Sequence, residues 1–172
     1  GEVEAASKWT LPRLVSLGDL RGDLPCHTKA SDGHHTVEEL VAAAEKRGYE
    51  YLLVSDHSPS ARVAGGLTAD ELAAHVKKVR AVQKKHPDIT VLAGSECDIL
   101  ADGSLDYPDA VLAGLDLVIG AVHSRFKQPG REMTARICRA LANPYVSILA
   151  HPTGRLIGER EPYDVDLDQV FR

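Results

Sequence analysis

A short, continuously apolar run followed by a polar tip and then a helical stretch recurs along this chain from Asp23 onward. Strands that are buried on both faces of a parallel sheet are continuously apolar, whereas half-exposed strands alternate apolar and polar residues. The recurring pattern therefore predicts an α/β fold of about five strand–helix units with parallel strands. The clearest expected strands cover residues 51–54, 89–93, 117–119 and 146–149.

The two longest helices have recognisable starting points. Thr36 and Thr68 are each followed three residues later by a glutamate, Glu39 and Glu71, which is the signature of a capping box. We therefore expect one helix to begin directly after each threonine. The remaining expected elements are helices over residues 108–115 and 132–141, a helix starting near residue 165, and an irregular segment over residues 1–22.

Composition excludes several classes of protein. Hydrophobic residues make up 44% of the 172, which is enough for a sizeable core, and no apolar run is long enough to cross a membrane. The net charge of −5 argues against a surface coated in basic residues, although it leaves room for a local basic patch. The three cysteines form neither a disulfide framework nor a zinc pattern, so we expect a reducing, cytoplasmic compartment and no membrane partner.

Residue types that bind metals follow the apolar run in each unit. In a parallel βα barrel, functional residues lie at the carboxyl ends of the strands. Imidazoles and carboxylates together suit zinc, manganese or iron, and two ions sharing a carboxylate can activate water and grip a phosphate oxygen. One such histidine would usually be structural, but the recurrence favours a shared metal centre. The predicted ligands are His27, Asp32, His57, Glu96, His123 and His151.

Other polar residues have less specific interpretations. His75 lies on the second long helix, where a solvent-exposed face is the expected location, and Cys97 is expected to be a buried packing residue. Asp98 fits equally well as a support for a metal ligand and as an ordinary loop carboxylate. Arg125 and Arg155 follow the fourth and fifth strands, and an arginine fork pairs well with phosphate oxygens. The alternative for both arginines is an exposed loop without a ligand.

Several motifs resemble a known family. Residues 23–28 (Asp-Leu-Pro-Cys-His-Thr) and 31–33 (Ser-Asp-Gly) resemble the opening motif of the polymerase and histidinol phosphatase (PHP) superfamily, and residues 55–58 resemble its second motif. Nearly the whole chain resembles, more narrowly, the PHP domain of bacterial family X DNA polymerases. The segments that carry this narrower likeness are residues 63–67, 105–108, 122–126 and 150–155.

The resemblance implies a distorted, seven-stranded βα barrel with up to three divalent metal ions, manganese or zinc. It implies a 3′–5′ exonuclease, in some members with cleavage at abasic sites, that acts on gapped DNA or 3′ ends. The parent polymerase would use magnesium and fill short gaps during DNA repair. Among the residues, the resemblance assigns Glu96, His123 and His151 to the catalytic core, His27 to the ion that it shares with Glu96, and Asp32 and His57 to a third ion.

The resemblance also implies a domain arrangement. Residues 1–22 would link an upstream polymerase core to the PHP domain, and residues 23–172 would form the N-terminal two-thirds of that domain. The family's late Asp-x-His pair and remaining strands would then lie beyond Arg172, so we expect residues 23–172 not to close a stable barrel alone.

One departure from the family pattern supports alternative functions. Pro25 occupies a position that is usually a ligating histidine, and proline offers no side-chain donor. A catalytically weak module that supports a polymerase is therefore one alternative. A small-molecule phosphatase of the histidinol-phosphatase type is the other.

Overall fold

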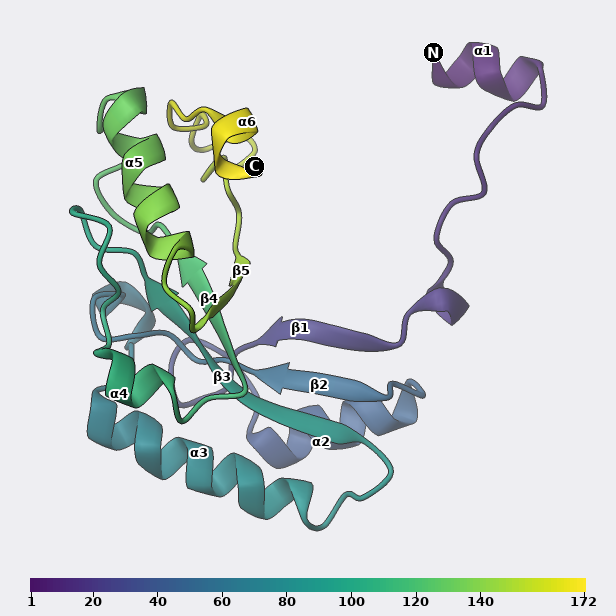
Figure 1. Ribbon diagram of the computed structural model, residues 1–172. Coiled ribbons are helices and arrows are strands. Elements are labelled where there is room, and N and C mark those ends of the chain that lie inside the picture. Colours follow the sequence, from purple (N-terminus) through teal and green to yellow (C-terminus); the bar gives the residue numbers. More distant parts are fainter.

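A computed structural model describes residues 1–172 and confirms the parallel α/β fold (Figure 1). The five strands form one sheet in sequence order, and every neighbouring pair is parallel. The sheet curls into part of a barrel, in which the first and last strands each have a single neighbour. The strands are β1 (Gly22–Cys26), β2 (Tyr51–Val54), β3 (Thr90–Asp98), β4 (Leu117–Ala121) and β5 (Val146–Leu149).

Helices connect the strands and pack on the sheet. Figure 1 shows α2 (Val37–Lys46) and α3 (Ala69–Gln83) lying together against the β2–β3 side of the sheet. The helix α5 (Gly130–Leu141) contacts β5 and the short α6 (Leu167–Val170), and α4 (Asp109–Leu112) precedes β4. Three apolar clusters fill the spaces between these helices and the strands. No helix is both long and apolar enough to cross a membrane.

Both predicted capping boxes are present. Thr36 Oγ1 accepts a hydrogen bond from the Glu39 amide at 3.2 Å, and the Glu39 carboxylate accepts one from the Thr36 amide at 2.7 Å. Thr68 and Glu71 repeat this exchange at 3.3 and 2.8 Å. Because each box satisfies amides that have no partner inside the helix, α2 and α3 begin directly after the two threonines, as predicted.

The strand β3 is longer than predicted. Its first half, residues 90–93, pairs with β2, whereas residues 94–98 pair with β4. This offset staggers the sheet, and such stagger accompanies the closure of sheets into barrels. Gly94 lies at the changeover, where an added Cβ would be 2.4 Å from the carbonyl oxygen of Leu117. The prediction that the strand ends before Glu96 is therefore wrong, because Glu96 lies inside the strand.

The prediction that residues 1–22 are irregular is wrong in part. Residues Glu2–Ser7 form α1, and Leu17–Asp19 form a short 3-10 helix that Ser16 and Asp19 cap reciprocally. A Glu4–Lys8 ion pair at 2.5 Å joins successive turns at the end of α1. Figure 1 shows this N-terminal segment standing apart from the sheet. Its large apolar side chains, among them Trp9, are exposed.

Candidate metal centre

The structure brings all six predicted metal ligands together at the carboxyl ends of the strands. His27 directly follows β1, His57 lies shortly after the end of β2, and Glu96 projects from β3. The loops after β4 and β5 supply His123 and His151. The sixth ligand, Asp32, comes from the loop between β1 and α2.

Glu96 is the centre of the cluster. Its Oε1 lies 3.2 Å from Nε2 of His123 and 3.1 Å from Nε2 of His151. Its other oxygen, Oε2, lies 3.3 Å from Nε2 of His27. The Glu96 side chain is only 5% exposed, so its two oxygens face imidazoles rather than water. A carboxylate placed in this way can serve two metal ions at once.

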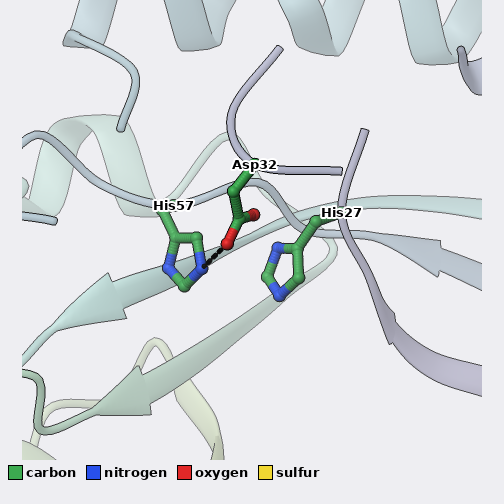
Figure 2. A group of neighbouring side chains, drawn as sticks. All are labelled: His27, Asp32 and His57. Atoms are coloured by element: carbon green, nitrogen blue, oxygen red, sulfur yellow. Dashed lines mark ion pairs between the residues drawn. The ribbon is translucent and has the colours of Figure 1, made fainter. Parts of the chain in front are cut away.

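His27, Asp32 and His57 form an outer group (Figure 2). Oδ2 of Asp32 lies 3.5 Å from Nε2 of His57, and the rings of His27 and His57 stack with their centroids 4.4 Å apart. One donor atom from each of the three residues falls within 4.8 Å of the others. Asp32 is 45% exposed, so this side of the cluster opens to solvent.

A second, inner group consists of His57, Glu96 and His123, whose donor atoms also lie within 4.8 Å of one another. His57 belongs to both groups, so the two groups are contiguous. His151 extends the inner group through its contact with Glu96. The cluster thus offers adjoining sets of nitrogen and oxygen donors.

The donor set fits divalent metal ions. No lysine or arginine forms an ion pair with Glu96, whose charged neighbours are all histidines. The Nδ1 atoms of His27 and His57 are buried without a hydrogen-bond partner. Buried polar atoms are usually paired, and imidazole nitrogen with carboxylate oxygen is a common ligand set for zinc, manganese and iron.

The protonation states also follow from these contacts. Burial alone would raise the pKa of Glu96, but the surrounding imidazoles outweigh it and hold that pKa far below its usual range. Burial and the neighbouring His27 lower the pKa of His57, which leaves its ring neutral at pH 7. Burial also opposes charge on His123, but Asp98 and Glu96 together raise its pKa to about 9.

Two buried residues support the inner group from behind. Asp98 is only 2% exposed, and its Oδ1 lies 2.5 Å from Nδ1 of His123, so it orients the ring and supports its basicity. Arg136 of α5 donates from Nε to the carbonyl oxygen of Ile99 at 3.1 Å and from a terminal nitrogen to that of Ser124 at 3.0 Å. Arg136 therefore fixes the chain directly after Asp98 and directly after His123.

The prediction that His75 lies on an exposed helix face is wrong. Its side chain is 10% exposed, and its Nε2 lies 2.9 Å from Oδ2 of Asp56. The apolar stripe of α3 contained a signal for this placement, because His75 follows the buried Leu72 by three residues and precedes the buried Val79 by four. Arg136 similarly follows the buried Met133 by three residues.

Arg125 and Arg155 lie in the loops that follow His123 and His151, where both are exposed and neither forms an ion pair. Their assignment to phosphate binding remains a prediction. Arg125 and His151 have positive φ angles of 56° and 28°, a conformation that side chains other than glycine rarely adopt. Such backbone strain tends to concentrate at functional sites.

Pro25 lies in β1, which is an edge strand. Proline cannot donate to a sheet, so an edge position accommodates it without loss of a strand–strand hydrogen bond.

Comparison with known proteins agrees with this geometry. The family model described as "PHP domain" matches residues 23–163. A Bacillus subtilis protein named "DNA polymerase/3′-5′ exonuclease PolX" is 45% identical over 158 residues, which cover 92% of this chain and 28% of that protein. Proteins named "probable phosphatase" from Clostridium acetobutylicum and Caldicellulosiruptor saccharolyticus are 33% and 31% identical, and each match covers 86% of this chain. The chain spans 57% and 58% of the lengths of these two proteins.

Proposed function

This chain belongs to the PHP domain family, and we propose that it hydrolyses phosphodiester bonds in DNA with the help of divalent metal ions. The observation that carries the proposal is the buried Glu96 carboxylate, which faces three imidazoles and forms no ion pair with a lysine or arginine. The likeness to the Bacillus subtilis protein supports DNA as the substrate and a 3′–5′ exonuclease as the activity. Cleavage at abasic sites is a further activity of the same class.

We infer that the cluster holds up to three ions, manganese or zinc. Glu96, His123 and His151 would hold one, His27 would join Glu96 on another, and Asp32 with His57 would hold the third. Ions of this kind activate water and neutralise negative charge on phosphate oxygens. Among the residues of the chain, Asp98 keeps the His123 ring oriented, and the exposed Arg125 and Arg155 would orient the phosphate from the rim.

We also propose a place for this chain in a longer protein. Residues 1–22 would connect a magnesium-dependent polymerase core to the PHP domain, and residues 23–172 would supply the N-terminal two-thirds of that domain. The match to 28% of the Bacillus subtilis protein supports a longer parent chain. We further propose gapped DNA or 3′ ends as the partner and short-gap repair as the role. The three free cysteines support a reducing, cytoplasmic compartment.

Two specific observations support other candidate functions. The likeness to the two proteins named as phosphatases favours a small phosphomonoester as substrate. Pro25, in a position where the family usually has a histidine, favours a catalytically weak module that binds metal and supports a polymerase. Substrate preference and metal content distinguish these candidates from the exonuclease.

A comparison of two substrates tests the proposal. With manganese present, the full-length protein that carries this chain is expected to shorten a single-stranded oligonucleotide faster than it hydrolyses a soluble phosphomonoester. A His123→Ala variant is expected to lose the activity, because His123 contacts Glu96 directly. Preference for the monoester would favour the phosphatase, and metal binding without either activity would favour the supporting module. Trimming at an unchanged rate in His123→Ala would place the active site elsewhere.

Metal affinity is expected to rise with pH. Asp98 and Glu96 raise the pKa of His123 to about 9 in the absence of metal, so below that pH the ring holds a proton that an incoming ion must displace. Loss of this one proton changes affinity by up to about tenfold for each pH unit. Zinc titrations between neutral pH and pH 9 measure the effect. In an Asp98→Asn variant the rise should level off at lower pH, and an affinity independent of pH in the wild type would contradict the explanation.

A further inference from the structure

We propose that the buried carboxylate of Asp56 is a positioning group that holds the outer group, His27, Asp32 and His57, in its metal-binding arrangement. The inference rests on the metal-binding part of the proposed function. It adds that this outer group and the trio of Glu96, His123 and His151 are held by separate buried networks, so that metal binding by one can be lost while metal binding by the other is retained.

Asp56 fastens the loop that carries two of the outer ligands. Its Oδ1 accepts hydrogen bonds from the Thr28 amide at 2.8 Å and from the Ser31 amide and hydroxyl at 3.2 and 2.6 Å. Its Oδ2 accepts one from the Thr28 hydroxyl at 2.9 Å. Thr28 directly follows the ligand His27, and Ser31 directly precedes the ligand Asp32. A single carboxylate therefore fixes both ends of the segment between these ligands.

The same carboxylate connects this loop to the third outer ligand and to a helix. Asp56 directly precedes His57, the third outer ligand. The residue that holds the loop is therefore adjacent in the chain to that ligand. His75 approaches from α3 with its Nε2 2.9 Å from Oδ2 of Asp56. Asp56 is completely buried, so none of these contacts competes with water. Each residue that Asp56 holds from the loop is next to a ligand, which is the geometry expected of a support behind a metal site.

Glu96, His123 and His151 do not depend on the Asp56 side chain. Asp98 orients His123, and Arg136 fixes the chain after both residues, with no contact to Asp56. The connection between Asp56 and the strand that carries Glu96 runs through main-chain atoms and the Ser95 hydroxyl, which bond to the Asp56 carbonyl oxygen. A substitution that changes only the carboxylate leaves these bonds in place.

The test measures metal binding one equivalent at a time in the full-length protein that carries this chain. Zinc titration gives the stoichiometry, and cobalt absorption spectra report the ligand geometry of each site. In an Asp56→Asn variant, the equivalents that depend on His27, Asp32 and His57 are expected to bind about 10–100-fold more weakly, as for other losses of a support behind a metal ligand, and their cobalt signals to change. The equivalent held by Glu96, His123 and His151 should keep its wild-type affinity.

Asp98→Asn is the matched control, because it makes the same chemical change behind His123. It is expected to weaken the equivalent held by Glu96, His123 and His151 and to leave the others intact, so the two variants should show opposite patterns. If Asp56→Asn weakens every equivalent together, or none, the separate positioning role is wrong.

A second pair of variants keeps the test decisive if Asp56→Asn does not fold. Thr28→Val removes the hydroxyl that bonds to Oδ2 of Asp56, whereas Thr28→Ser retains it. The valine variant should weaken the same equivalents as Asp56→Asn, and the serine variant should bind them as the wild type does. Equal binding by both would overturn the inference. A wild-type protein that binds no metal would instead contradict the proposed function itself.

Discussion

Replacing Glu96 with glutamine is expected to remove metal binding across the cluster and to lower phosphoesterase activity by more than about 100-fold. Replacing a residue that only supports a metal ligand already lowers metal affinity or activity about 10–100-fold. A larger loss is expected here, because Glu96 itself faces His27, His123 and His151. Glutamine keeps the size of the side chain but loses the negative charge that two ions would share. Activity on the oligonucleotide and bound zinc, measured on the same preparation, give the result.

Glu132 provides the control for this substitution, because it is an exposed glutamate on α5. A Glu132→Gln variant makes the same chemical change and is expected to keep both activity and metal. Wild-type activity in the Glu96→Gln variant would show that the cluster is not the active site. Lost activity with full metal content would instead assign Glu96 a role other than that of a ligand.

Replacing Arg136 with methionine is expected to lower the free energy of unfolding by about 2–4 kcal/mol. Arg136 is 2% exposed and donates hydrogen bonds to the carbonyl oxygens of Ile99 and Ser124 and to the side chain of Gln128. Methionine fills much of the same space but leaves the buried Ile99 carbonyl and the part-buried Ser124 and Gln128 acceptors without this donor. Each buried group that remains unpaired costs about 1–3 kcal/mol. Urea denaturation measures the loss of stability.

Two further variants test whether the loss of stability comes from the hydrogen bonds of Arg136. One keeps its charge, and the other replaces a different arginine of the same helix. Arg136→Lys keeps the charge but lacks the planar fork, so an intermediate loss is expected. Arg131→Met changes an exposed arginine of the same helix and should leave stability nearly unchanged. If Arg136→Met unfolds at the same midpoint urea concentration as the wild type, the two carbonyl groups must find other partners.

The strands at residues 51–54 and 146–149 are predicted to the residue. The first is bounded by the polar residues Glu50 and Ser55, and three of its four residues are buried. The prediction fails at β3, where Gly94, Ser95 and Glu96 read as a polar tip. These residues remain in the strand because they pair with residues 117–119 of β4. The Ser95 hydroxyl also donates to the carbonyl oxygen of Asp56, just beyond the end of β2.

The candidate ligands are easier to predict from the sequence than the residues that support them. Five of the six lie at or near the ends of successive strands, so recurrence identifies them, whereas Asp32 lies in the loop between β1 and α2. Asp56, His75 and Arg136 act through partners that lie far away in the chain, and single-sequence patterns do not reveal such pairings. His75 and Arg136 still leave a signal in the sequence, because each is a polar residue on the apolar stripe of a helix. A polar side chain on a buried helix face indicates a specific polar partner.

The pairing of β3 with β2 and then with β4 limits how this chain can change in length. Glu96 and Asp98 lie on one face of the strand, and Cys97 between them is buried in an apolar cluster on the other. Because side chains alternate with a period of two, one inserted or deleted residue before Glu96 would exchange the two faces. The carboxylates would then enter the apolar cluster, and a packing residue would face the histidines. Length variation in homologous chains should therefore be confined to the surface connections and absent from residues 94–98.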